Sequence, residues 1–334
     1  MVLSIPTRLV RLAFAGALCA GPLMAAPVAR AAQTVKVSAG AESPGGDVQL
    51  LEFAPVNVTI NTGDTVTWSL DSTEFHDVIF TGGGQPPDFV QPGPDGVFIN
   101  PLVAMPQGGT SYDGSGVAGS GLLNKGQTYS LTFSKAGTYT YYCAIHQGMV
   151  GTVQVQAPGQ TVDTQDAIDA RKAAQVGSEI DSKGVPTIMT NQGELPTEGS
   201  TIGVVAGAQN GPTDVQRFFP PRAVIHAGDS VTWVWKTQDT PHTVTFLSGG
   251  PVPDVVVPQP QPNGPPKLQL NPMVLAPSGD PTNWNGGSFL NSGFLQPMPG
   301  QPTPTFTVHF NNPGTYDYVC VLHEAMAGTI QVLE

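Results

Sequence analysis

Two segments, one in each half of the chain, have almost the same sequence, and this internal repeat constrains the fold more than any other feature. The first segment reads GTYTYYCAIHQGMVGT over residues 137–152, and the second reads GTYDYVCVLHEAMAGT over residues 314–329. Each is an aromatic and β-branched run, typical of a strand, followed by the pattern Cys-x-x-His-x-x-Met. The two halves are therefore expected to fold in the same way.

The repeat extends upstream of these loops and supplies one further histidine to each half. Thr62–Trp68, followed by His76, aligns with Ala227–Trp233, followed by His242. A thiolate, two imidazoles and a thioether are soft or borderline donors, which suit copper better than calcium, magnesium or manganese. The candidate ligands are His76, Cys143, His146 and Met149 in the first half, and His242, Cys320, His323 and Met326 in the second.

These donors and their loops resemble those of the cupredoxins, the small blue copper proteins that include plastocyanin and amicyanin. The short spacing between the second histidine and the methionine is closest to amicyanin, and the resemblance covers about residues 34–156 and 201–334. It implies an all-β fold of two tandem Greek-key β-sandwich domains that carry two type 1 copper ions. It also implies electron transfer by Cu(I)/Cu(II) cycling. In the family the downstream histidine reaches the surface as the electron port, a role that would fall to His146 and His323.

Composition agrees with an all-β chain, because 40 glycines and 33 prolines separate short runs rich in Val, Thr, Tyr and Phe. A period of two predicts that Tyr139, Tyr141 and Cys143 share one strand face, with Tyr142 on the other. The predicted strands are Val56–Ile60, Thr65–Leu70, Thr128–Phe133, Thr138–Cys143 and Thr152–Val155, with counterparts Val224–His226, Ser230–Trp235, Thr305–Phe310, Thr315–Cys320 and Thr329–Leu333.

The predicted organisation has four parts: a secretory signal at residues 1–31, a first domain at 32–157, a linker at 158–200 and a second domain at 201–334. Within the linker, Asp166–Val176 contains good helix formers and no helix breaker, which predicts a short helix. The sequence leaves open whether this linker fixes the two domains or merely tethers them.

Each half also contains a long Gly/Pro-rich excursion, at about residues 81–124 and 247–299. The two excursions share Asn-Pro at positions 100 and 271, and Ser-Gly at positions 120 and 292. They therefore belong to the duplicated unit, which favours packed structure over a disordered insert. A docking surface is the other interpretation.

The amino terminus predicts export. Arg8 and Arg11 accompany an apolar run that contains Cys19, and a cleavage site is expected after Ala31. Residues 16–18 do not fit a lipoprotein signal, and no later apolar run approaches the roughly 18 residues that a membrane span requires. The mature protein is expected to be periplasmic or extracellular.

The mature chain would retain only Cys143 and Cys320. Thiols usually oxidise outside the cytoplasm, so a metal-bound thiolate explains how each stays unpaired. The alternatives are an inter-domain disulfide or two small buried apolar residues.

The formal net charge of −12 argues against a nucleic-acid partner, since phosphates require Lys and Arg. It favours a basic or weakly charged redox partner protein, although solubility alone is an equally good reason for the charge.

Two-domain and three-domain cupredoxins include enzymes, namely multicopper oxidases and copper nitrite reductases, which need additional histidine ligands. This chain has six histidines, and only His226 and His309 remain after the candidate ligands are assigned. Neither recurs in the repeat, so both are predicted to be ordinary strand residues. The sequence therefore predicts an electron carrier and not an enzyme. Copper carriage or storage is a third possibility, but such sites are usually open, whereas these donor sets are complete.

The two halves differ next to the upstream histidine, where cupredoxins commonly have Asn. The first half has Asp77 there, and the second has Thr243. A charged carboxylate near the copper would lower the reduction potential of the first site, whereas a carboxylate that faces solvent would have little effect.

Overall fold

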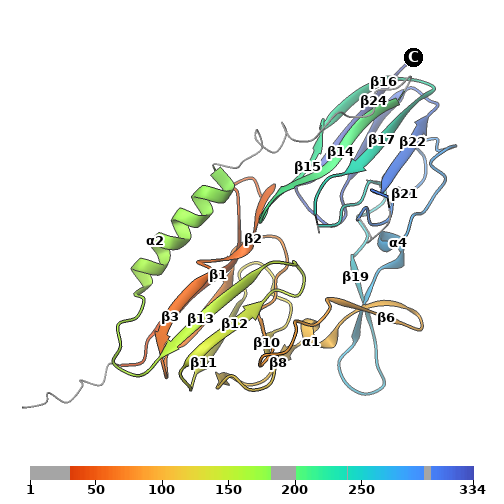
Figure 1. The fold of residues 1–334 in the computed structure, drawn as a ribbon. Coiled ribbons are helices and arrows are strands. Elements are labelled where there is room, and N and C mark those ends of the chain that lie inside the picture. Colours follow the sequence, from red (N-terminus) through yellow and green to blue (C-terminus); the bar gives the residue numbers. More distant parts are fainter. Residues whose placement is uncertain (1–30, 182–200, 239, 297–301) are drawn as a thin grey trace, which may run out of the picture.

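The computed structural model describes residues 31–181, 201–238, 240–296 and 302–334, and these residues form two β-sandwiches (Figure 1). The all-β prediction is confirmed, and every predicted strand is present to within two residues. Residues 1–30 of the predicted signal, including Cys19, and residues 182–200 of the predicted linker lie outside the described part of the chain.

The described part of the first half contains thirteen strands and the one-turn helix α1 (Pro101–Ala104). The strands are β1 (Thr34–Glu42), β2 (Val48–Ala54), β3 (Asn57–Asn61), β4 (Thr65–Leu70), β5 (Ile79–Phe80), β6 (Val90–Gly93), β7 (Gly96–Ile99), β8 (Pro106–Gln107), β9 (Ser111–Tyr112), β10 (Ala118–Ser120), β11 (Thr128–Phe133), β12 (Gly137–Tyr142) and β13 (Val150–Gln156).

The second half follows a similar order, with fewer described strands after its one-turn helix α4 (Pro272–Leu275). Its described strands are β14 (Thr201–Asn210), β15 (Thr213–Phe219), β16 (Arg222–His226), β17 (Asp229–Trp235), β18 (Thr245–Phe246), β19 (Val256–Gln259), β20 (Lys267–Leu270), β21 (Leu290–Asn291), β22 (Thr305–Phe310), β23 (Gly314–Val319) and β24 (Ala327–Leu333).

Each half closes around its own aromatic core. In the first half the buried ring of Trp68 packs edge-on against Tyr141, with ring centroids 5.1 Å apart. Trp233 and Tyr318 repeat this contact at the same separation in the second half. Both tyrosines lie on the strand that ends next to the loop cysteine, so the core fixes the position of that loop. The predicted alternation is confirmed, because Tyr141 and Cys143 are buried and Tyr142 is not.

One nine-stranded sheet runs through both halves in the order β22-β17-β14-β15-β2-β1-β4-β11-β9. Its two parts join where β15 pairs antiparallel with β2, for example at Thr213 and Leu50. Apolar residues from both halves cover this junction, including Leu50, Val205 and Phe219. Ile180, near the end of the described part of the linker, belongs to the same apolar cluster, so the strand pairing and the linker both hold the halves together.

The two excursions form a second junction. The β6–β7 hairpin comes from the first half and the β19–β20 hairpin from the second. β7 and β20 pair at Phe98 and Gln269, so the hairpins make one four-stranded sheet, seen where they cross in Figure 1. An apolar cluster that includes Ile99, Val103 and Leu270 packs there. The excursions are therefore packed structure whose surface docks one half on the other.

The shared residues of the excursions have the same structural roles. Asn100 and Asn271 each cap a one-turn helix, where the side-chain oxygen accepts a hydrogen bond from the backbone N–H two residues on. Ser120 and Ser292 each accept a hydrogen bond of 2.9 Å from the backbone N–H of a core valine.

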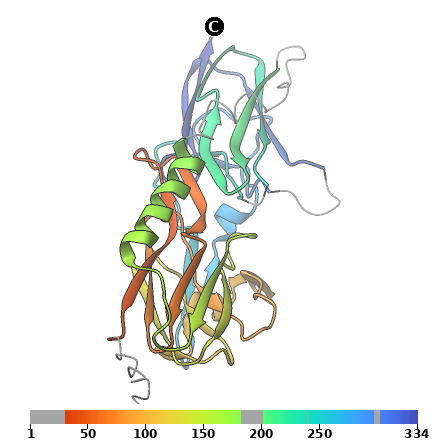
Figure 2. The same ribbon diagram turned by 60° about the vertical axis from the view of Figure 1, so that its left-hand side comes forward.

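The predicted helix is present as α2 (Gln165–Val176), which continues into a π-helical turn, η1 (Gly177–Asp181). It packs along the first half (Figure 2) and buries Ile168. The side chain of Gln165 accepts a hydrogen bond of 2.7 Å from the backbone N–H of Lys36, and Lys172 forms an ion pair with Asp71 at 2.8 Å. The helix is thus held on the first sandwich and does not act as a loose tether.

Candidate metal centres

Each Cys-x-x-His-x-x-Met segment folds into a tight loop directly after a strand. The Cys143 N–H donates to the Met149 carbonyl at 3.0 Å, and the Met149 N–H donates to the His146 carbonyl at 3.2 Å. The second loop has the same two bonds, at 2.9 Å between Cys320 and Met326 and at 3.1 Å between Met326 and His323. These bonds fix the cysteine, histidine and methionine of each half relative to one another. Met149 and Met326 are buried.

The upstream histidines enter from the segment that follows β4 or β17. His76 pairs with Leu123, and His242 pairs with Leu295, in isolated β-bridges. The partner leucine lies near the end of the excursion in each case, so the excursion also holds the upstream histidine in place.

The predicted donors converge in both halves. In the first, Cys143 Sγ lies 3.7 Å from Nδ1 of His76 and 3.7 Å from Nδ1 of His146, and the two Nδ1 atoms are 3.1 Å apart. In the second, Cys320 Sγ lies 3.9 Å from Nδ1 of His242 and 3.3 Å from Nδ1 of His323, and the two Nδ1 atoms are 3.0 Å apart.

A metal ion fits this arrangement. A first-row metal bonds imidazole nitrogen at about 2.0 Å and thiolate sulfur at about 2.3 Å, so its donors lie roughly 3–4 Å from each other. All six donor residues are buried, and the two triads are the only clusters of three or more His, Cys, Asp or Glu of metal-binding geometry in the described ranges. Neither cysteine forms a disulfide, so the disulfide alternative is wrong.

Two glycines that the sequence analysis missed support the upstream histidines. A Cβ atom on Gly40 would lie 2.4 Å from Nε2 of His76, and one on Gly207 would lie 1.9 Å from Nε2 of His242. Both glycines have positive φ angles, of 78° and 70°, at an irregularity in the strand pairing. The sequence did contain a signal, because Ala-Gly-Ala recurs at residues 39–41 and 206–208.

Asp77 is buried at the first site, so the solvent-facing interpretation is wrong. It is 1% exposed, and its Oδ1 accepts a hydrogen bond of 2.7 Å from the backbone N–H of Ala144. Burial raises the pKa of Asp77 to about 6. In the second half the Thr243 hydroxyl accepts the equivalent bond, 2.8 Å from the Val321 N–H. The two residues brace the cysteine loop in the same way, but only Asp77 can bring a charge.

The thiols of the two sites have different electrostatic surroundings. Burial raises the pKa of Cys143, and the neighbouring Asp77 carboxylate raises it further because two negative charges repel. Burial acts in the same direction on Cys320, but the His323 and His242 rings hold the pKa of Cys320 well below its usual value. The backbone N–H of Thr243 also donates to Cys320 Sγ at 3.3 Å. The surroundings of Cys143 therefore disfavour the thiolate, and those of Cys320 favour it.

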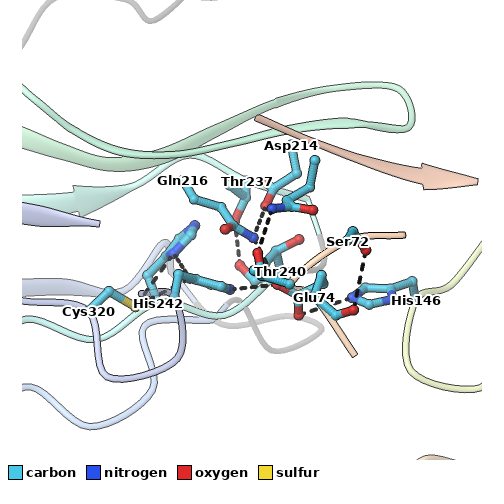
Figure 3. A network of polar contacts seen from close by, with 12 residues as sticks. Ser72, Glu74, His146, Asp214, Gln216, Thr237, Thr240, His242 and Cys320 are labelled. Carbon is cyan, nitrogen blue, oxygen red and sulfur yellow. Dashed lines mark hydrogen bonds and ion pairs between the residues drawn. The ribbon is translucent and has the colours of Figure 1, made fainter. Parts of the chain in front are cut away.

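The downstream histidines do not reach the surface. The side chains of His146 and His323 are only 6% and 3% exposed, and the Nε2 edges of both rings face the carboxylate of Glu74. Figure 3 shows Glu74 between His146 of the first site and the residues of the second. The expectation of two surface electron ports is therefore wrong, because docking of the two halves covers both ring edges.

The remaining histidines lie on strands, as predicted. His226 is an exposed residue at the end of β16. His309 lies on β22, where Nδ1 is 3.1 Å from the Ser230 hydroxyl. Neither belongs to a donor triad. No helix in the described part of the chain is both long enough and apolar enough to cross a membrane.

Comparison with known proteins agrees with this geometry. The profile of the copper binding proteins of the plastocyanin/azurin family matches residues 40–156. Plastocyanin from Solanum tuberosum is 36% identical over 114 residues, which cover 33% of this chain and 94% of that protein. Chloroplastic plastocyanin from Tetradesmus obliquus is 35% identical over 136 residues, 40% of this chain and 79% of that protein.

Among solved structures, a Cu(I) form of an amicyanin variant is 26% identical, covers 39% of this chain and 86% of its own, and has a TM-score of 0.24. Plastocyanin from Solanum tuberosum is matched over 94% of its length, and each half of this chain carries a donor triad on a β-sandwich. The chain therefore belongs to the plastocyanin/azurin family of cupredoxins, with the cupredoxin domain present twice.

Proposed function

We propose that this chain is an extracytoplasmic electron-transfer protein that carries two type 1 copper ions, one in each half. The observation that supports this most directly is the pair of buried triads, each with one Sγ and two Nδ1 atoms converging on one point. His76, Cys143, His146 and Met149 would hold the first ion, and His242, Cys320, His323 and Met326 the second. Copper bound in this way supplies one-electron cycling between Cu(I) and Cu(II).

The fold suits such a role because contacts within the protein hold the donors in position. The loop hydrogen bonds, the glycines behind the upstream rings and the buried Trp-Tyr contacts each fix one donor. A rigid donor set that both oxidation states tolerate needs little rearrangement when an electron passes. Rigidity also favours electron transfer over copper delivery, which requires an open site.

An electron carrier also fits the histidine inventory better than an enzyme does. His226 and His309 lie on strands of the second half, outside both triads. The partners are proposed to be redox proteins that are basic or weakly charged, since the chain has a net charge of −12. Export to the periplasm or the cell exterior is proposed from the amino-terminal sequence.

Copper titration tests the proposed function. We expect the mature protein to bind two copper ions per chain and to become intensely blue, with narrow copper hyperfine splitting in the electron paramagnetic resonance spectrum. The reason is that both donor sets contain a thiolate and two imidazoles. A single copper per chain, or a pale tetragonal spectrum, would contradict the proposal.

A second prediction concerns the reduction potentials. The first site should have the lower potential, and Asp77→Asn should raise it, because a buried charge beside the Cys143 loop favours Cu(II) over Cu(I). The asparagine amide oxygen can still accept the Ala144 hydrogen bond, so the loop geometry is retained. Redox titration measures both potentials, with the exposed Asp88→Asn as the charge-matched control. A first-site potential that does not respond to Asp77→Asn would show that this residue has no such role.

A further inference from the structure

A single carboxylate connects the two candidate metal centres. Glu74 Oε1 lies 3.6 Å from Nε2 of His146, and Glu74 Oε2 lies 3.5 Å from Nε2 of His323. The side chain of Glu74 is only 14% exposed. These separations are ion-pair distances and exceed those of good hydrogen bonds. In each half Nδ1 of the downstream histidine belongs to the donor triad, and Nε2 of the same ring faces Glu74.

Residues from both halves hold Glu74 in place, one through its side chain and one through its backbone. The side chain of Gln216, on β15 of the second half, donates a hydrogen bond of 2.9 Å to Glu74 Oε2. The Ser72 hydroxyl donates to the Glu74 carbonyl at 3.4 Å (Figure 3). The Glu74 side chain is therefore held between the two rings.

Glu74 is not part of the repeat. The equivalent position, two residues before the upstream histidine, is Thr240 in the second half, and its carbonyl accepts a hydrogen bond from the Trp235 indole at 2.9 Å. A feature needed only to bind copper would be expected in both halves. A contact between the two centres instead requires only one carboxylate, placed where the two halves meet.

We infer that Glu74 bridges the two copper sites and that electrons pass between them inside the chain, through the His146 ring, the Glu74 carboxylate and the His323 ring. This inference rests on the proposed function. In each transfer one electron leaves Cu(I) at one site, which becomes Cu(II), and reduces Cu(II) at the other to Cu(I). No bond forms or breaks. No proton has to leave, because the carboxylate faces an imidazole N–H on each side.

The rate of electron tunnelling falls steeply with distance across a non-bonded gap and more slowly along bonded atoms. The geometry therefore favours this route. The route crosses two imidazole rings and one carboxylate, with two short non-bonded contacts between them. The same contacts cover the ring edges that a partner protein would otherwise use. Glu74 therefore makes the two centres one unit, in which an electron received at one site can be passed to the other.

Pulse radiolysis tests the bridge in the full mature protein loaded with copper. A small amount of radical reductant reduces one site per molecule, and the redistribution of the electron is followed in the blue bands. The variants Cys143→Ser and Cys320→Ser supply the spectrum of each site alone. We expect rapid redistribution in the native protein, and redistribution slower by about tenfold or more in Glu74→Ala. Glu74→Gln, which keeps the volume but can accept from only one ring, should be intermediate.

A second readout separates the bridge from a purely structural role. Removing the charge between the sites should raise both reduction potentials in Glu74→Ala, because both copper(II) ions lose the same nearby anion. Arg217→Gln is the matched structural control, since Arg217 forms an ion pair with Asp47 across the junction and does not contact Glu74. Glu324→Gln, an exposed carboxylate in the second loop, is the charge control. Both controls should retain the native redistribution rate.

The outcomes are distinguishable. If the native protein forms no blue sites, the proposed function fails. If both sites are blue and Glu74→Ala redistributes the electron at the native rate, the bridge is wrong. Equal slowing in Arg217→Gln, or loss of one blue band in Glu74→Gln, would also overturn it, because Glu74 would then support only the junction or a single site.

Discussion

Cys143→Ser should remove about half of the blue absorption, Cys320→Ser the other half, and the double variant all of it. The blue band of a type 1 site depends on the thiolate, and each triad takes its thiolate and both imidazoles from its own half. The other half keeps its donors, its loop hydrogen bonds and its core when one cysteine is replaced. Absorption spectra and copper analysis of the three variants measure this directly.

The serine variants also show whether the sites are independent as binding sites. Each single variant should retain one copper ion with native hyperfine splitting. Its reduction potential can still shift, because the charged copper site on the other side of Glu74 is lost. Bleaching of the whole protein by one substitution would mean that the sites share a ligand, which is contrary to the separate triads.

Gly40→Ala should weaken copper binding at the first site, and Gly207→Ala should do so at the second. A Cβ atom would lie 2.4 Å from His76 Nε2 in one case and 1.9 Å from His242 Nε2 in the other, so the ring or the strand must move. Displacement of one imidazole should lower the affinity for copper by about 10–100-fold. The effect should be larger at the second site, where the contact is closer.

Gly63→Ala and Gly228→Ala are the matched controls for backbone strain. Their φ angles are 92° and 93°, so alanine is strained there too, but no atom lies within 4 Å of the new Cβ. All four variants should have a lower free energy of unfolding. Only Gly40→Ala and Gly207→Ala should bind copper more weakly, as measured by competition with a chelator. A normal affinity in both would show that the glycines do not position the histidines.

The sequence by itself determined the local parts of this protein. The repeated loops predicted both donor triads, and alternation predicted which side of the cysteine strand is buried, because a period of two and a loop of seven residues are short-range properties. The matched Asn-Pro and Ser-Gly pairs in the excursions also indicated packed structure, and their hydrogen bonds proved to be the same in both halves.

Only the tertiary structure decided how the two halves meet. The pairing of β2 with β15 and of β7 with β20 joins residues far apart in the chain, and strand periodicity does not specify a partner for an open edge. That docking buries His146 and His323, which the family resemblance had placed at the surface. Glu74 could not be found by comparing the halves, because its counterpart is Thr240. Its place between the two donor triads exists only because the folded halves bring both rings to the same carboxylate.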